Sequence, residues 1–141
     1  MAYQYYNPNP RHKRHVGDCV IRAIARATDQ TWEAVYCAVC AEGFADGNMP
    51  SGNDVWGNLL RAWGFRRVSI PDRCDSGECY TLRDFCVDHP VGTFVIGTGT
   101  HAVCVRDGDY YDIWDSGDTT PEYAWEKPLC GTSSSINTNP S

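Results

Sequence analysis

Apolar residues in the first half of the chain recur three to four positions apart, which is helical spacing. This spacing predicts four helices, at Cys19 to about Thr28, Thr31 to about Gly43, Ser51 to about Gly64, and Leu82 to Asp88. Asp18 precedes the first helix at the N-cap position. Ser51 and Thr81 are each followed three residues later by an aspartate, so a capping box is expected at the third and fourth helices.

After Pro90 the pattern changes to short β-type runs separated by glycine-rich or Asp-Gly turns. The runs are Thr93–Ile96, His101–Val105 and Tyr110–Trp114, and a further short strand is expected at Phe65–Ile70. Helices followed by an antiparallel sheet are typical of an α+β fold. We expect one domain over residues 1–130, with residues 1–15 as an extended arm, and a disordered tail at 131–141.

Composition and charge narrow the function classes. The formal net charge of the 141 residues is −6, which disfavours nucleic acid as a partner, and the basic run at residues 11–15 is interpreted as a solvated segment. No apolar run is long enough for a membrane helix, and the first residues lack the apolar core of a signal peptide. We therefore expect a cytoplasmic protein without membrane contact, whose eight cysteines are mostly free thiols. The oligomeric state stays open.

Gly17-Asp18-Cys19 places a thiol at the start of a predicted helix. The partial positive charge of the unpaired N–H groups there lowers the pKa of a thiol, and the same groups can hold an oxyanion. Gly17 permits a tight turn and the close approach of a substrate backbone. Cys19 is therefore a candidate nucleophile, although a cysteine that merely packs at a helix start would show the same pattern.

His101 begins a predicted strand directly after a glycine-rich segment, which gives a base both a rigid mount and an open side. The two-residue turn signal Asp107-Gly108 folds the next strand back along it. A two-residue loop sets His101 across from Trp114, and one further loop residue sets it across from Asp115. Either register brings a carboxylate within reach of the imidazole, as Asp115 or alternatively as Asp112.

The order of nucleophile on a helix, base on a strand and acid on the next strand resembles the papain-like cysteine peptidases. The resemblance is closest at His101-Ala102-Val103 and at Asp115-Ser116-Gly117, which is similar to the Asn-Ser-Trp-Gly segment of that family. Gly17-Asp18-Cys19 followed by Arg22-Ala23 also resembles the nucleophile motif of ovarian-tumour-type deubiquitinases, Asp-Gly-Asn-Cys-x-x-Arg-Ala. Through Met49-Pro50-Ser51, Thr98-Gly99-Thr100-His101 and Tyr111-Asp112-x-Trp114-Asp115, the chain further resembles, over most of its length, small proteins encoded by bacteriophages and gut bacteria.

These resemblances imply a papain-like fold and a cysteine hydrolase that cleaves a peptide or isopeptide bond. Cys19 would be the nucleophile, His101 the base and Asp115 the residue that orients the base. The partner would be a protein or peptide substrate, with a host protein as one candidate if the chain is phage-encoded, and no cofactor or metal is implied. An acyl transferase or amidase with the same triad, and a non-catalytic phage-encoded binding protein, are the alternatives.

The resemblance has one gap, at the oxyanion donor. Papain-like enzymes carry a glutamine several residues before the nucleophile, and the corresponding stretch here is the basic run His12-Lys13-Arg14-His15. The backbone N–H of Cys19 would then be one donor, and the candidate side chains are Asn7, His12 and Lys13.

Three further residues or pairs carry secondary hypotheses. Trp114 would shield the contact between the imidazole and its acid from water, and Arg22 would bind an acid that supports the site. Cys74 and Cys79 have a spacing that leaves a structural zinc site open, although a buried or free-thiol role is favoured for most cysteines.

Overall fold

The structure is a computed structural model, and residues 2–71 and 78–128 of it are described. Its four helices are α1 (Cys19–Thr28), α2 (Trp32–Asp46), α3 (Asn53–Ala62) and α4 (Leu82–Asp88). The four helices predicted from apolar spacing are confirmed. The predicted tail at 131–141 lies outside the described residues.

Two helix ends differ from the prediction for local reasons. α2 continues past Gly43 to Asp46, because Gly47 supplies the left-handed cap with a φ of 68°. α3 begins at Asn53 with Gly52 as its N-cap, so the capping box expected at Ser51 does not form. The box at α4 does form, with Thr81 Oγ1 accepting from the Asp84 N–H at 3.2 Å and the Asp84 carboxylate accepting from the Thr81 N–H at 2.9 Å.

Six strands form one sheet in the order β1-β5-β4-β3-β6-β2. They are β1 (Tyr3–Tyr5), β2 (Arg66–Val68), β3 (Thr93–Gly97), β4 (Ala102–Arg106), β5 (Asp109–Asp112) and β6 (Tyr123–Glu126). The expected antiparallel sheet is in fact mixed, because β1 pairs with β5 in parallel. β1 lies inside the segment expected to be an arm, so the first residues are part of the sheet, and only about residues 7–17 form a loop.

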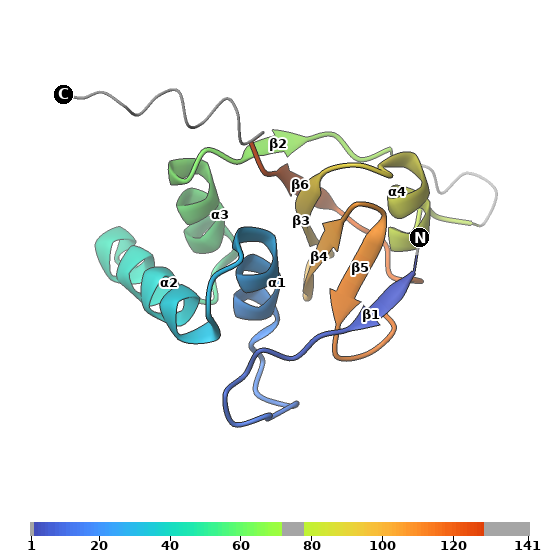
Figure 1. Ribbon diagram of the computed structural model, residues 1–141. Helices are drawn as coiled ribbons and strands as arrows, with labels where there is room; N and C mark the ends of the chain where they lie inside the picture. Colours follow the sequence, from blue (N-terminus) through green and yellow to red (C-terminus); the bar gives the residue numbers. More distant parts are fainter. Residues whose placement is uncertain (1, 72–77, 129–141) are drawn as a thin grey trace.

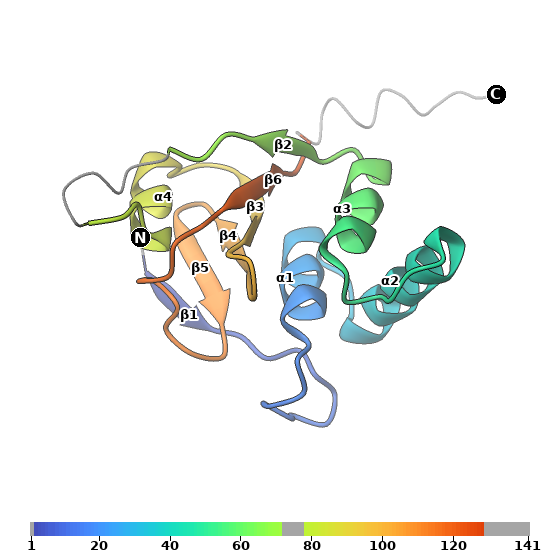
Figure 2. The same cartoon turned by 180° about the vertical axis from the view of Figure 1, so that it is seen from behind.

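The sheet has helices on both faces (Figures 1 and 2), and alternate residues of β3 and β4 serve the two sides. Val95 and Cys104 pack with Ile24 of α1 in one core cluster, which also takes in residues of α2 and α3. Phe94 and Val105 pack with α4 in a second cluster. Period-two alternation therefore accounts for a buried layer on each side. α1 lies between the sheet and the pair α2 and α3 (Figure 1).

The fold is α+β, as expected from the order of the elements. Within residues 2–71 and 78–128, no helix combines the length and apolar character needed to cross a membrane.

Candidate active site

Cys19 is the first residue of α1 and is partly buried. Gly17 turns the chain into the helix with a φ of 69°, in the left-handed region that favours glycine. The Asp18 carbonyl accepts the Arg22 N–H at 2.9 Å, but its side chain makes no capping hydrogen bond, contrary to the expected N-cap role. The N–H groups of the first turn are therefore left uncapped by Asp18, and their partial positive charge is directed at the thiol end of the helix.

The imidazole of His101 lies between this thiol and a carboxylate. Its Nε2 is 2.6 Å from Oδ2 of Asp112, and the ring is close enough to Cys19 to lower the pKa of that thiol. Because Nε2 faces Asp112, Nδ1 is the ring nitrogen left for the thiol. Cys19, His101 and Asp112 thus bring a thiol, an imidazole and a carboxylate together in one row.

The register of the hairpin explains which acid meets His101. β4 and β5 pair Cys104 with Tyr111 and Arg106 with Asp109, so the loop at Asp107-Gly108 has two residues. Extended past the end of β4, this register sets His101 opposite Trp114 and diagonal to Asp112. Diagonal neighbours on paired strands lie within reach of long side chains.

Asp115 is not the partner of His101, contrary to the first expectation from the sequence. Its Oδ1 accepts a hydrogen bond from the Tyr110 hydroxyl and lies 3.1 Å from Nη2 of Arg83. The Asp115 side chain is 48% exposed, whereas that of Asp112 is 1% exposed. The alternative third residue, Asp112, is the one that the structure brings to the imidazole.

The electrostatics of the three groups favour a charged pair. Burial raises the pKa of the Cys19 thiol, but the interactions of the thiol with His101, the Ala102 backbone and the Arg22 charge together bring that pKa below its ordinary value. Burial lowers the pKa of His101, but the hydrogen bonds to Asp112 and Cys19 outweigh burial and raise it to about 9. Burial raises the pKa of Asp112, and hydrogen bonds from His101 and Ser116 bring it below its ordinary value. A thiolate beside an imidazolium is the form that these shifts favour.

Arg22 extends the chain of charges behind the triad. Its guanidinium contacts the Asp112 carboxylate at 3.2 Å and also binds Asp18, and all three side chains are at most 6% exposed. Asp18 accepts further hydrogen bonds from Trp32 Nε1 at 2.9 Å and from the Asn9 amide at 3.4 Å. Negative and positive groups therefore alternate from Asp18 to Cys19. This arrangement agrees with the hypothesis that Arg22 binds an acid that supports the site.

A cavity of about 440 Å³ opens over Cys19 and His101. Arg14, Gly17, Thr100 and Trp114 contribute to its lining. The Trp114 ring packs on the imidazole with centroids 5.2 Å apart, so it covers His101 on one side. Trp114 itself is 46% exposed. The thiol therefore faces a space that a small acyl group can enter.

The three side chains expected to hold an oxyanion are not among the residues that line this cavity. The Asn7 amide donates to the Lys13 carbonyl at 3.1 Å and so holds the loop together. His12 is exposed and has a φ of 56°, and Lys13 lines a neighbouring cavity instead. The uncapped first turn of α1 is the group of donors that the structure presents beside the thiol.

The other cysteines differ from Cys19 in environment. Burial raises the pKa of both Cys86 and Cys104 to about 12. Cys79 is disulfide-bonded, and the other five cysteines of the described ranges are free, as expected for most of them. Cys74, the other half of the open zinc hypothesis, lies outside the described residues. Within the described ranges, no group of three histidine, cysteine or acidic residues is placed to hold a metal ion.

Four residues of the site were not identified as functional from the sequence: Asn9, Asp18, Trp32 and Ser116. Ser116 is fully buried and donates its hydroxyl to Asp112 Oδ2 at 2.7 Å. The indole N–H of Trp32 binds the Asp18 carboxylate. Of these four residues, only Asp18 carried a signal in the sequence, because it lies four residues before Arg22 and so has the i,i+4 spacing of a helical acid–base pair.

Comparison with known proteins gives no relative from which to transfer a role: no protein-family model, curated protein or solved structure matches the chain.

Proposed function

We propose that the protein is a cysteine hydrolase of the papain-like kind, which cleaves a peptide or isopeptide bond through an acyl-enzyme. The observation that carries the proposal is the 2.6 Å contact of His101 Nε2 with the buried Asp112, in a ring that also lowers the pKa of Cys19 at a helix N-terminus. Nucleophile, base and acid in these positions are the arrangement that thiol-based acyl transfer needs. Asp112 takes the orienting role.

In the proposed reaction the Cys19 thiolate attacks the acyl carbon, and the carbonyl electron pair moves onto oxygen. The N–H groups of the first turn of α1 face that oxyanion. The imidazolium of His101 gives its proton to the leaving amine, so the C–N bond breaks and a thioester remains. Neutral His101 then takes a proton from water, hydroxide adds to the thioester, and the thiolate leaves with the carboxylic acid as product.

Asp112 and Arg22 support this cycle without touching the substrate. Asp112 fixes the ring so that Nδ1 faces the sulfur, and it stabilises the imidazolium when the pair is charged. Arg22 and the Ser116 hydroxyl hold the Asp112 carboxylate in place from two other sides. These residues are positioning residues in the proposal.

The experiment is acylation by a small activated ester, p-nitrophenyl acetate, followed by mass spectrometry of the intact and digested protein. We expect a burst of nitrophenol, one acetyl group on Cys19, and slow return of free thiol as water hydrolyses the thioester. His101→Asn should remove the burst, while Phe44→Ser, which changes an exposed residue on α2, should leave it unchanged.

The outcomes separate the alternatives. An acetyl group that leaves Cys19 only when an amine is added would indicate an acyl transferase. Acetylation of Cys19 no faster than that of the exposed Cys37 would contradict the proposed catalysis and favour a non-catalytic binding protein.

A further inference from the structure

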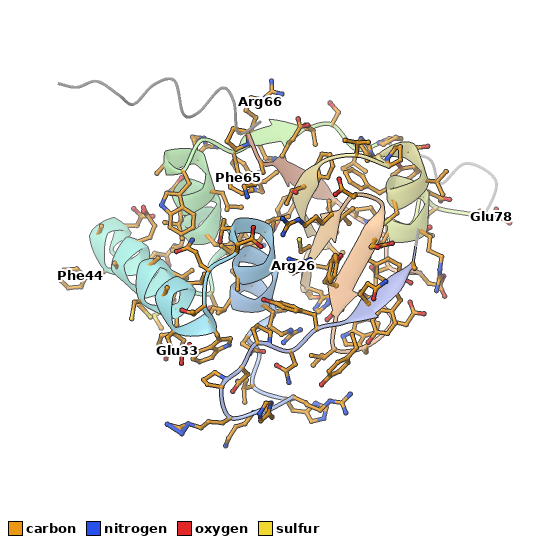
Figure 3. All side chains as sticks on the ribbon, viewed as in Figure 1. Arg26, Glu33, Phe44, Phe65, Arg66 and Glu78 are labelled. Atoms are coloured by element: carbon orange, nitrogen blue, oxygen red, sulfur yellow. The ribbon has the colours of Figure 1, made fainter. Side chains whose placement is uncertain are left out.

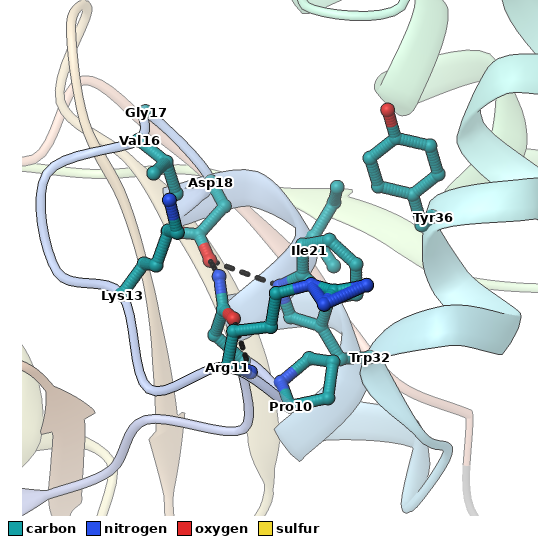
Figure 4. Close-up of a pocket in the computed structure, with 10 residues that line it drawn as sticks. Pro10, Arg11, Lys13, Val16, Gly17, Asp18, Ile21, Trp32 and Tyr36 are labelled. Carbon is teal, nitrogen blue, oxygen red and sulfur yellow. Dashed lines mark hydrogen bonds between the residues drawn. The ribbon is translucent and has the colours of Figure 1, made fainter.

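A second cavity, of about 420 Å³, lies between the loop that precedes Cys19 and helix α2. Its walls include Arg11, Lys13, Val16, Ile21, Trp32 and Tyr36 (Figure 4). The Trp32 and Tyr36 rings pack together with centroids 5.0 Å apart. Val16 and Tyr36 are each nearly half exposed, so apolar surface that the core does not use faces this space.

This cavity adjoins the cavity of the triad at Gly17, which lines both. A Cβ built on Gly17 would meet no atom within 4 Å, so the passage over this residue is open. Cys19 is only two residues further on. A chain whose acyl carbon sits at the thiol can therefore continue over Gly17 and reach Trp32 and Tyr36.

The free charge in the second cavity is positive. Arg11 and Lys13 have no ion-pair partner in the described part of the chain. The one carboxylate in the lining, Asp18, is already bound by Arg22, Trp32 and Asn9, as the dashed contact to Trp32 in Figure 4 illustrates. The cavity is thus locally basic in a chain whose formal net charge is −6.

We propose that this second cavity is a substrate-recognition subsite that takes an apolar side chain flanked by carboxylates, so that the substrate is an acidic peptide segment. The apolar side chain packs against Trp32 and Tyr36, and the carboxylates pair with Arg11 and Lys13 at the rim. The assignment of the bound segment as a substrate rests on the proposed hydrolase function.

The same charges determine which segments the subsite rejects. A basic tail would place cations beside Arg11 and Lys13 without a free carboxylate to offset the repulsion. Because ions screen exposed charges, the preference of the subsite for acidic over basic segments should weaken as the salt concentration rises. The contacts to the aromatic pair are apolar, so ions do not screen them.

The test measures binding in Cys19→Ala protein, so that it does not depend on thiol chemistry. The probes are acetyl-Glu-Leu-Glu-Gly-amide and acetyl-Lys-Leu-Lys-Gly-amide, followed through the NMR resonances of the Trp32 indole N–H and the Gly17 amide. We expect the acidic peptide to shift both resonances and to bind about tenfold or more tightly than the basic one at low salt.

Matched variants separate the charge from the apolar contact. Arg11→Glu with Lys13→Glu should remove the preference, whereas Arg66→Glu, the same reversal on the remote strand β2, should keep it (Figure 3). Tyr36→Ser should weaken both peptides, whereas Phe44→Ser, further along α2 and 90% exposed, should change neither.

Equal binding of the two peptides, or no shift at Trp32 and Gly17, would overturn the inference. Stronger binding of a single-stranded oligonucleotide at the same resonances would overturn it too, in favour of phosphate recognition. Loss of ester acylation with retained peptide preference would contradict the proposed catalysis while leaving the subsite in place as a binding site.

Discussion

Two arginine–aspartate pairs join α1 to the β4–β5 hairpin, one at each end of the helix, and they differ in almost every property. At the N-terminal end Arg22 contacts Asp112, and the two side chains are 6% and 1% exposed. At the C-terminal end Arg106 contacts Asp29 at 2.8 Å, and the two side chains are 27% and 58% exposed. The same two residue types thus connect the same two elements, once in a buried environment and once in an exposed one.

The difference lies in what each pair can do for its neighbours. The exposed pair is screened by water and contributes about 0–1 kcal/mol. The buried pair is desolvated, so each charge depends on its partners for stabilisation. A change at one group therefore alters the electrostatic energy of the neighbouring group. Because His101 and Cys19 continue the buried chain of charges, the pair at the N-terminal end of α1 is the one that acts on the Cys19 thiol.

The largest effect is expected on stability. Arg22→Met leaves the buried Asp18 and Asp112 carboxylates without their shared cation, which should lower the free energy of unfolding by about 3–5 kcal/mol. Arg106→Met, the matched change at the other end, should lower it by about 0–1 kcal/mol. Urea unfolding of both variants measures the difference, and equal losses would contradict the contrast between the two ends.

The next effect concerns the two aspartates at the end of β5. Asp112→Asn removes the charge that supports the imidazolium, so the Cys19 pKa should rise and alkylation of Cys19 at pH 6 should slow by about tenfold or more. Asp115→Asn should leave this rate unchanged, because Asp115 binds Tyr110 and Arg83 instead. A slower rate in Asp115→Asn alone would restore Asp115 as the orienting acid.

A smaller effect is expected in the pH dependence of stability. A raised His101 pKa stabilises the fold below the ordinary value of 6.5, and this contribution is lost as the pH rises towards about 9. In wild-type protein the thiolate offsets this loss: folded imidazolium with thiolate and unfolded imidazole with thiol carry equal numbers of protons. The unfolding free energy of the wild type should therefore stay level between these two pH values.

Cys19→Ala removes that compensation. Its unfolding free energy should fall over the same pH range by about 1–3 kcal/mol, because Asp112 alone still raises the His101 pKa. Both proteins should lose stability as the pH falls through the lowered pKa of Asp112. Parallel curves for the two proteins above pH 6.5 would show that Cys19 is not ionised beside His101.

The same contrast explains how far the sequence could predict the molecule. Periodicity located all four helices, and Asp107-Gly108 gave the hairpin, because both signals are local. The three-residue strand β1 was missed because it exists only through its parallel pairing with β5, more than a hundred residues away. The sheet was consequently expected to be purely antiparallel.

The site followed the same division between local and distant interactions. Cys19 and His101 are marked by the helix start and the strand start beside them. The choice between Asp112 and Asp115 depends on register, and the roles of Asn9 and Ser116 depend on side chains that meet only in the folded chain. The expected oxyanion side chains failed because the loop folds on itself, with Asn7 bonded to Lys13.

The most direct test of the thiolate–imidazolium pair is the pH profile of iodoacetamide alkylation, resolved by mass spectrometry for each cysteine. Cys19 should reach its full rate at a lower pH than an ordinary thiol, whose pKa is 9.0, and His101→Asn should move its profile up to that of an ordinary thiol. Exposed Cys37 is the internal control in both proteins. If Cys19 follows the same profile with and without His101, the account of the site is wrong.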